Sequence, residues 1–432
     1  MKSDWPVVSL EKVTSILGDG LHGTPKYDEN GEYYFINGNN LKDGKIVITE
    51  KTKRSDSEQY EKHKKDLNER TILVSINGTI GNVAEYNGEP VFLGKSACYF
   101  NVKEDVDKKY VKYVVSSPIF KSYLNRLASG STIKNVSLKL MREFSFKLPP
   151  LEIQRGISNV LSALDEKIEI NSSMNQTLEK IAQRIFKSWF IDFDPVKANA
   201  EGVTFADLSP DIQSLFPSEF VESEMGLIPK GWDVQQIGDE VTCVGGATPS
   251  TSNPDFWEGG ELLWTTPKDL SGEESKILFD TARKITHSGL KKISSGLLPV
   301  NTVLMSSRAP VGYLALAKEQ VAINQGYIAM KCENTIGPLY LLNWLERNMD
   351  TIKQSAGGTT FSEISKKSFR PISMLVSDRA VANAFEDIVT SLYEKIEANV
   401  RQNASLRLIR DKLLPKLLSG SIEIKQELDE AS

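Results

Sequence analysis

The sequence predicts a mixed α/β (α+β) fold in which two similar domains and two long helices form a pseudo-two-fold internal repeat. Three observations support this prediction. The two halves of the 432-residue chain share short motifs in the same order. Each half begins with short β-branched and aromatic runs separated by Gly, Asn and Pro, which is typical of strands joined by tight turns. Each half ends in a long segment with heptad spacing, which is typical of a coiled coil.

The repeat has a period of about half the chain, so its unit is a whole domain with its helix rather than a small solenoid repeat. The matching pairs are Trp5 with Trp232, Gly23–Pro25 with Ala247–Pro249, Thr71–Ser75 with Thr302–Ser306, Gly81 with Gly312, Ala128–Thr132 with Ala356–Thr360, and Glu166–Asn171 with Glu394–Asn399. Because the order is preserved and the spacing drifts by only a few residues, we expect two domains of one fold.

Short apolar runs place the strands of each domain. The predicted strands are Tyr33–Ile36, Ile72–Ile76, Val91–Leu93, Ala97–Val102, Val303–Met305, Tyr313–Ala317 and Tyr327–Met330, and the predicted domain helices are Lys109–Leu127 and Leu339–Gln354. The resulting division of the chain is a first domain at 1–149, a central long helix at 150–191, an acidic linker at 192–230, a second domain at 231–371, a C-terminal long helix at 372–420 and an acidic tail at 421–432.

Heptad spacing predicts that the two long helices pair with each other. Counting alternately four and three residues from Ile153 gives eight apolar positions of eleven, and the same count from Val381 gives seven of eleven. The predicted seam contains Ile157, Leu164, Lys167, Asn171 and Leu178 in the central helix, and Phe385, Leu392, Lys395, Asn399 and Leu406 in the C-terminal helix. The polar seam positions would lower stability but would fix the register and the antiparallel orientation.

Composition and charge exclude several classes of protein. The formal net charge is −5, but the linker carries a net −6 and the tail a net −3, so the remainder is +4 and leaves room for a local basic face. The three cysteines and three histidines lie far apart, which excludes a disulfide framework and a zinc site. No apolar window is long enough to span a bilayer and the first residues lack a signal core, so we expect a cytoplasmic protein.

Several motifs resemble the specificity subunit of Type I restriction–modification systems. They are Trp189–Ala198, Leu215–Pro217, Gly226–Trp232, the Ser306–Gly312 turn and the terminal Leu413–Gly420. The resemblance covers essentially the whole chain. It implies two target-recognition domains, each reading one half of a bipartite site in double-stranded DNA. The helices would set the spacer between the half-sites and dock two methyltransferase (modification) subunits, and restriction subunits would join them. S-adenosylmethionine, ATP and magnesium would then belong to the partner subunits, with no cofactor and no catalytic site on this chain.

Sequence discrimination requires side chains that reach base edges from loops. Asn77 and Arg308 occupy corresponding turns after an apolar strand, and Asn suits adenine as Arg suits guanine. The alternative is that Asn77 supports its turn and Arg308 pairs with a carboxylate of its own domain. The other loop candidates for DNA contact are Lys26, Lys95, Lys134 and Asn135 in the first domain and Lys268, Asn324, Gln325 and Thr360 in the second.

Two further hypotheses concern partners and chemistry. Phe186, Trp189 and Phe190 lie near the end of the central helix, and we expect them to face outward and dock the methyltransferase subunits. The alternative function is a metal-dependent nuclease that acts through Asp255, Glu274 and Lys276, two acids and a lysine that would have to lie on adjacent strands to hold magnesium.

Overall fold

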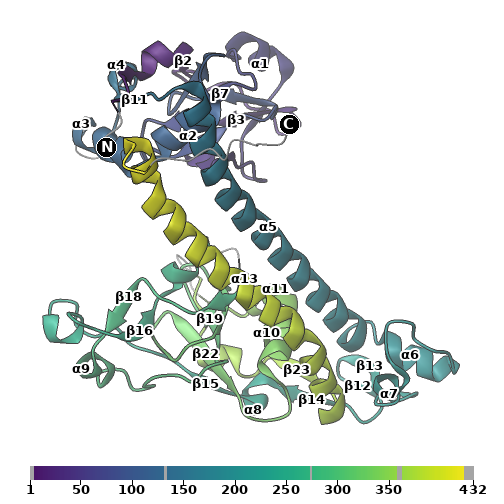
Figure 1. Ribbon diagram of the computed structural model, residues 1–432. Helices are drawn as coiled ribbons and strands as arrows, with labels where there is room; N and C mark the ends of the chain where they lie inside the picture. Colours follow the sequence, from purple (N-terminus) through teal and green to yellow (C-terminus); the bar gives the residue numbers. More distant parts are fainter. Residues whose placement is uncertain (1–3, 131–133, 273–274, 358–361, 423–432) are drawn as a thin grey trace, which may run out of the picture. The chain divides into compact units, whose positions relative to one another are not determined.

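The computed structural model describes residues 4–130, 134–272, 275–357 and 362–422. It divides into two compact units (Figure 1). Unit 1 comprises the chain up to Ile168 together with the chain from Ala404 onward, and unit 2 comprises Glu169–Asn403. Unit 2 is therefore continuous in sequence, whereas unit 1 is assembled from both ends of the chain. None of the helices in the described part of the chain is long and apolar enough to cross a membrane.

The domain in unit 1 is built on a four-stranded sheet with smaller sheets beside it. The main sheet has the order β2 (Thr14–Asp19), β10 (Ala97–Val102), β7 (Thr71–Ser75), β8 (Val83–Glu85). The smaller sheets are β6 (Arg54–Ser55), β3 (Tyr33–Ile36), β9 (Val91–Leu93); β1 (Val7–Ser9), β11 (Ser145–Lys147); and β4 (Leu41–Lys42), β5 (Lys45–Ile46). The domain helices are α1 (Ser57–His63), α2 (Lys108–Ser116), α3 (Pro118–Leu127) and α4 (Leu138–Glu143).

The domain in unit 2 repeats this order with one added strand. Its main sheet has the order β15 (Val241–Val244), β22 (Tyr327–Cys332), β19 (Val303–Ser306), β20 (Leu314–Ala317), β17 (Ile277–Leu278). The smaller sheets are β18 (Arg283–Ile285), β16 (Leu262–Thr265), β21 (Val321–Ile323) and β14 (Asp233–Gln236), β23 (Ser373–Val376), and the helices are α8 (Ile237–Glu240), α9 (His287–Leu290), α10 (Pro338–Arg347), α11 (Met349–Gln354) and α12 (Lys366–Phe369). The matching strand orders confirm the predicted duplication.

Both predicted domain helices are broken into two. Ser117 ends α2 and caps α3 by accepting a hydrogen bond from the backbone of Phe120, with Pro118 in the first turn of α3. Asn348 separates α10 from α11 in the other domain. A Ser-Pro pair at a helix start is a recognisable boundary in sequence, because proline lacks the amide hydrogen that an interior helix position needs.

The acidic segment between the central helix and the second domain forms four short elements on unit 2. These are α6 (Asp194–Glu201), α7 (Pro210–Gln213) and the hairpin of β12 (Phe220–Ser223) and β13 (Gly226–Pro229). Val196, Phe216 and Ile228 from this segment are buried in the core of unit 2. The segment is therefore held by apolar contacts despite its charge.

The two long helices are α5 (Leu151–Phe190) and α13 (Arg379–Ser419), and the six residues before α13 include strand β23 rather than a first helical turn. Within unit 2 they pair in antiparallel orientation through a buried polar layer. Asn171 Nδ2 donates to Asn403 Oδ1 and Asn399 Nδ2 donates to Asn175 Oδ1, each at 2.8 Å. These two bonds are equivalent under the repeat, which relates 171 to 399 and 175 to 403. The rest of the layer is not symmetric, because Asn171 Nδ2 also donates to Gln402 Oε1 at 2.8 Å and Asn403 Nδ2 donates to Ser172 Oγ at 3.2 Å.

The buried stripe on each helix runs one residue later than the predicted seam. On α5 it comprises Gln154, Ser158, Leu161, Asp165, Ile168, Ser172, Asn175, Glu179, Ala182, Phe186 and Trp189, all buried except the half-buried Asp165. Ile157, Asn171, Phe385 and Asn399 of the predicted seam are also buried, and Leu164, Leu178, Leu392 and Leu406 are half-buried. Lys167 and Lys395 are exposed, which corrects their assignment to the seam. Counting apolar residues misplaced the register because the buried stripe contains so many polar side chains.

Phe186, Trp189 and Phe190 are not docking residues on an outer face. Each is at most 3% exposed and lies in the core of unit 2. Phe186 packs edge-on against Tyr340 of α10 at 5.1 Å between ring centroids, and Trp189 packs edge-on against Phe216 at 5.0 Å. The repeat places Leu414, Leu417 and Leu418 at the corresponding positions of α13, and these are buried in the core of unit 1. The end of each long helix thus completes the core of a domain.

Candidate nucleic-acid interface

Three loops of the first domain meet at one edge of its sheets. Strands β3 and β9 are parallel, so the loops at 37–40 and 94–96 leave the sheet at the same edge. The turn at 76–80 joins them, because Ile76 N donates to Ser96 O at 2.9 Å and Gly94 N donates to Ile36 O at 2.8 Å. We call these three loops, together with residues 134–135, the loop edge of domain 1.

The corresponding loop edge of domain 2 consists of 266–270, 307–311, 324–326 and residue 363. Asn324 N donates to Thr265 O at 3.0 Å and Ser307 N donates to Gly326 O at 2.8 Å, which repeats the backbone frame of the first domain. Behind this frame, the hydroxyl of Tyr327 lies 3.1 Å from Thr265 Oγ1, and burial raises the pKa of Tyr327 so that the hydroxyl keeps its proton. The backbone frame is therefore common to both domains, and the Tyr327–Thr265 contact supports it in domain 2.

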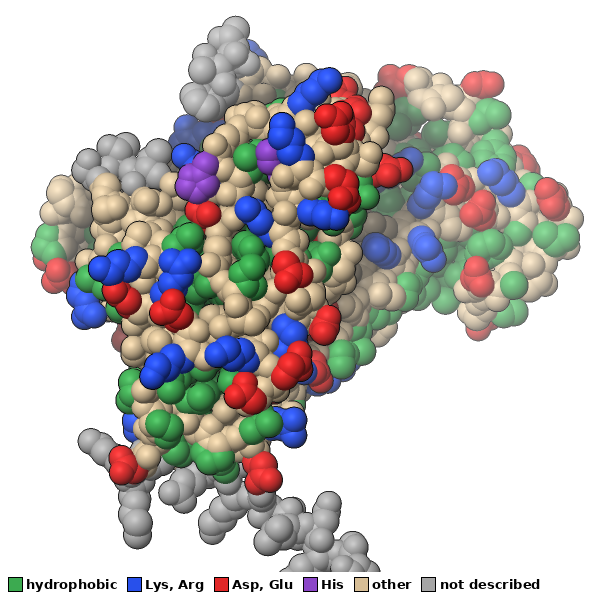
Figure 2. Space-filling model, turned by 90° about the horizontal axis from the view of Figure 1, so that it is seen from above, with side chains coloured by type: hydrophobic (Ala, Val, Ile, Leu, Met, Phe, Trp, Pro, Cys, Tyr) green, Lys and Arg blue, Asp and Glu red, His purple; other side chains and the backbone are tan. Residues whose placement is uncertain are grey.

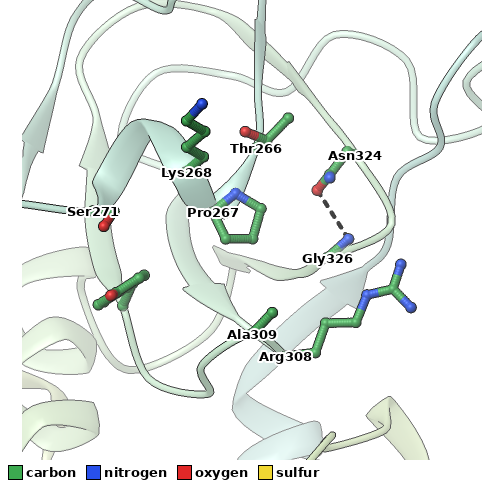
Figure 3. Close-up of a pocket in the computed structure, with 9 residues that line it drawn as sticks. Thr266, Pro267, Lys268, Ser271, Arg308, Ala309, Asn324 and Gly326 are labelled. Carbon is green, nitrogen blue, oxygen red and sulfur yellow. Dashed lines mark hydrogen bonds between the residues drawn. The ribbon is translucent and has the colours of Figure 1, made fainter. Parts of the chain in front are cut away.

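A pocket of about 330 Å³ opens on the loop edge of domain 2 (Figure 3). Lys268, Arg308 and Asn324 reach it from three different loops, with Thr266, Ser271 and Tyr313 among its other lining residues. Asn324 Oδ1 accepts a hydrogen bond from the backbone of Gly326 at 2.9 Å, which fixes its amide. The structure thus brings together three of the five residues that the sequence singled out in this domain.

Asn77 and Arg308 occupy equivalent places on the two edges, and each has an equivalent neighbour. Asn77 forms an isolated antiparallel bridge with Asn135, and Arg308 forms one with Glu363. The Asn77 amide donates weakly to Asn135 at 3.4 Å, and Arg308 Nη1 lies 3.8 Å from Glu363 Oε1. Each side chain therefore has a partner within its own domain, as the second alternative expects, and each remains at the surface.

The other predicted residues lie at varying distances from these pairs. Lys134 joins the Asn77 turn through a backbone bond to Gly78 at 3.0 Å, and Lys95 lies exposed in the loop at 94–96. Gln325 accepts from the Thr248 hydroxyl at 2.7 Å beside Asn324. Lys26 instead lies beside α1, where its backbone nitrogen donates to Gln59. Thr360 lies outside the described residues.

The structure adds candidates that the sequence analysis missed. Glu363 lies beside Arg308. Asn39 occupies in domain 1 the place that Lys268 occupies in domain 2, because each lies between the two residues of a capping box (Asn37 with Asn40, Thr266 with Asp269). Extending the repeat by offset would have found both residues. The face displayed in Figure 2 mixes basic with acidic side chains, so no single sign of charge dominates it.

Lys276 of the nuclease alternative is engaged in contacts with other carboxylates. Lys276 Nζ lies 2.5 Å from Glu179 of α5 and 3.3 Å from Glu346 of α10, so it joins a helix to the domain. Burial lowers the pKa of Lys276, but these two carboxylates outweigh burial and leave the pKa raised. Asp255 lies in a short 3-10 turn and Glu274 lies outside the described residues. Among the described residues, no group of three or more His, Cys, Asp or Glu side chains could hold a metal ion.

Comparison with known proteins shows what the chain is similar to. The profile of the Type I restriction modification DNA specificity domain matches residues 2–180 and 229–376. The Type I restriction enzyme HindI specificity subunit of Haemophilus influenzae is 28% identical over 68% of this chain and 72% of its own length. The putative type I restriction enzyme MjaX specificity subunit of Methanocaldococcus jannaschii is 26% identical over 98% of this chain and 94% of its own. The crystal structure of an S subunit from M. genitalium shares the fold, with a TM-score of 0.53 at 18% identity over 98% of this chain and 97% of its own.

Proposed function

The chain belongs to the Type I restriction–modification DNA specificity family, and we propose that each of its two domains reads one half of a bipartite site in double-stranded DNA. One observation carries the proposal. The two loop edges share a backbone frame but present different polar side chains, amides on domain 1 and a guanidinium with a carboxylate on domain 2. A constant frame with variable base-reading groups is what recognition of two different half-sites requires.

The long helices connect the two reading domains, so we propose that their length sets the unread spacer between the half-sites. The polar layer of Asn171, Asn175, Asn399 and Asn403 fixes the register of the helices, because any slip would leave buried amides unpaired. A fixed register converts helix length into a fixed distance, as dimer geometry does for helix-turn-helix proteins.

The same proposal assigns the chemistry to partner subunits. Methyltransferase subunits would bring S-adenosylmethionine, and restriction subunits would bring ATP and magnesium, while this chain contributes sequence selection. In place of the buried aromatic residues, the exposed apolar side chains Ile170, Met174 and Ile181 offer the docking surface, being 55%, 38% and 39% exposed. Their spacing places them along one face of α5.

Methylation mapping tests the reading proposal. In cells that carry this chain with its methyltransferase, we expect one bipartite motif to be methylated. Replacing Asn77 and Asn135 together with Ala should relax the bases of one half-site and leave the other half-site and the spacer unchanged. Lys109→Ala, an exposed change on α2 beside Glu166 of α5, is the matched control. Absence of any methylated motif, or relaxation of both halves by the domain 1 variant, would contradict the proposal.

Helix insertion tests the spacing proposal. One heptad added to both long helices should lengthen the unread spacer and leave the read bases unchanged. A heptad in α5 alone would break the antiparallel register and should destabilise the protein instead. An unchanged spacer after the paired insertion would refute the role of the helices as a ruler.

Co-purification tests the docking surface. Ile170→Ser combined with Met174→Ser should release the methyltransferase subunit without lowering the stability of this chain, because both side chains are exposed. Lys180→Ser, an exposed change elsewhere on α5, serves as the control. Retained co-purification would place the docking surface elsewhere.

A further inference from the structure

The structure assigns a second reading residue to domain 2. We propose that Arg308 and Glu363 together read one G·C base pair, with the guanidinium donating to guanine O6 and N7 and the carboxylate accepting from cytosine N4. The inference rests on the proposed function, since it names the base pair that the loop edge of domain 2 selects.

Backbone contacts hold the two residues side by side. Arg308 and Glu363 are directly opposed in an antiparallel bridge, and Ile364 N donates to Ser307 O at 2.9 Å. Glu363 is also bridged to Gly357 on its other side, with N–O distances of 2.9 and 3.0 Å. Directly opposed residues place their side chains on one face of the ladder, about 5 Å apart at Cβ. The pair is therefore positioned by the main chain, whatever the two side chains are.

The two side chains lie near each other without forming a hydrogen bond. Their closest charged atoms are 3.8 Å apart, too far for a hydrogen bond, and the side chains are 39% and 53% exposed. An exposed pair of this kind adds little to stability. Domain 1 carries two asparagines at the same places on the same frame. The fold thus does not require an ion pair here, and its donors and acceptors remain available to a ligand.

The chemistry of the pair matches the major-groove edge of one base pair. Guanine presents two acceptors, N7 and O6, and cytosine presents the N4 donor beside them. Arg308 offers two donors in a planar fork, and Glu363 offers an acceptor next to it. An exposed carboxylate on a DNA-binding edge would otherwise be repelled by the phosphates, and a base donor gives it a favourable partner.

The competing explanation is that Glu363 only neutralises Arg308, and base analogues separate the two. The probes are duplexes of the mapped site bound by the full chain assembled with its methyltransferase. Replacing the guanine with 7-deazaguanine removes N7, and replacing the cytosine with N4-methylcytosine blocks the donor in the groove. We expect each analogue to weaken binding by the wild-type complex about 10-fold. Arg308→Ala should abolish the sensitivity to 7-deazaguanine, and Glu363→Ala should abolish the sensitivity to N4-methylcytosine.

A swap and a control complete the test. The double variant Arg308→Asn with Glu363→Asn installs the domain 1 pair and should shift the preference at that position from G·C toward A·T. Glu333→Ala removes a comparable exposed acid beyond the far end of β22 and should change no base preference. If Glu363→Ala strengthens binding to all sequences equally, or if the variants keep the wild-type base preference, the inference is overturned while the proposed function stands. If the wild-type complex shows no sequence preference, the proposed function itself fails.

Discussion

The two domains differ in how they cap one equivalent helix start, the N-terminus of α2 in domain 1 and of α10 in domain 2. In domain 1, Asp107 caps α2 by accepting from Tyr110 N at 2.7 Å, and Ser158 of α5 donates to the same carboxylate at 2.5 Å. In domain 2 the cap residue is Gly337, and the carboxylate comes from Glu386 of α13, which accepts from Leu339 N and Tyr340 N at 3.0 Å each. The repeat relates Ser158 to Glu386, so the carboxylate and its neighbour have exchanged chain positions.

The exchange shows what the repeat preserves. Orphaned amide hydrogens at a helix start need an acceptor and the helix dipole favours a negative charge, so a carboxylate remains at this point in space in both domains. Gly337 has no side chain because a Cβ there would lie 2.3 Å from the Glu386 carboxyl group. Each long helix is thus joined to a domain by the same interaction made from different residues.

The largest effect is expected at the equivalent helix ends, Trp189 and Leu417. Trp189→Ala should lower the free energy of unfolding of unit 2 by about 3–5 kcal/mol, and Leu417→Ala should lower that of unit 1 by about 2–4 kcal/mol, because both side chains are at most 2% exposed. Hydrogen exchange during denaturant titration assigns each loss to its unit. Unchanged stability of the Trp189 variant, with weaker methyltransferase binding alone, would restore the outward-facing prediction.

Substitutions at the two helix caps test whether the cap arrangements of the two domains are interchangeable. Gly337→Asp should crowd the Glu386 carboxyl group, and Glu386→Ser should leave two backbone amides without their acceptor, each costing about 2–3 kcal/mol. The double variant installs the domain 1 arrangement and should recover most of that loss in denaturant unfolding. Additive losses would show that the two caps are not interchangeable.

Smaller losses of stability are expected in the amide layer between the two long helices. Asn399→Ala removes one of the two equivalent bonds and should cost about 1 kcal/mol, whereas Asn171→Ala also removes the bond that Asn171 Nδ2 donates to Gln402 Oε1 at 2.8 Å and should cost about 1–2 kcal/mol. Gln176→Ala on the exposed face of α5 is the control for the substitution itself. An unchanged free energy of unfolding after either substitution would contradict the stabilising role of this layer.

The smallest expected effect is on the pH dependence of stability, and it concerns domain 2 alone. Burial raises the pKa of Glu386 above its ordinary value of 4.5, against the backbone bonds of Leu339 and Tyr340 that lower it. The folded state then holds a proton that the unfolded state has lost, so this group's contribution to stability falls as pH rises above 4.5 toward the folded pKa. Stability measured against pH should therefore show the cost of Glu386→Gln shrinking over that window.

A control with the opposite sign accompanies that measurement. The Thr242 hydroxyl and Lys331 hold the pKa of Glu333 below its ordinary value. The cost of Glu333→Gln should grow as pH rises toward 4.5, and the change should be small because solvent screens this exposed position. Equal slopes for the two variants would contradict the burial argument.

The duplication, the strand runs and the two long helices could be predicted from the sequence, because repeats and periodicity depend on local patterns. The seam register could not, since Gln154, Ser158, Ser172 and Asn175 are buried on α5 whereas Val160, Met174 and Ile181 are exposed. Polar side chains that find hydrogen-bond partners on other elements can be buried, so a count of apolar positions does not locate the buried face. Phe186 and Trp189 were misplaced for a related reason, because no local pattern shows that the following acidic segment folds over them.

The candidate interface was predicted in outline. Loop position and residue chemistry identified Asn77 and Arg308, and the fold confirms that they occupy equivalent turns. Their neighbours Asn135 and Glu363 come from a loop about 55 residues further along the chain. Asn135 was included among the candidates, but Glu363 was missed because only basic, amide and hydroxyl side chains were considered.

The discontinuous make-up of unit 1 has a consequence for how the protein is made. Leu414, Leu417 and Leu418 complete the core of unit 1, yet the ribosome synthesises them after the whole of unit 2. The domain that emerges first therefore completes its core last, and the apolar residues that these leucines cover stay without them while more than two hundred residues are translated. Premature termination before Leu414 should release a chain whose second half is native and whose first half is a substrate for chaperones.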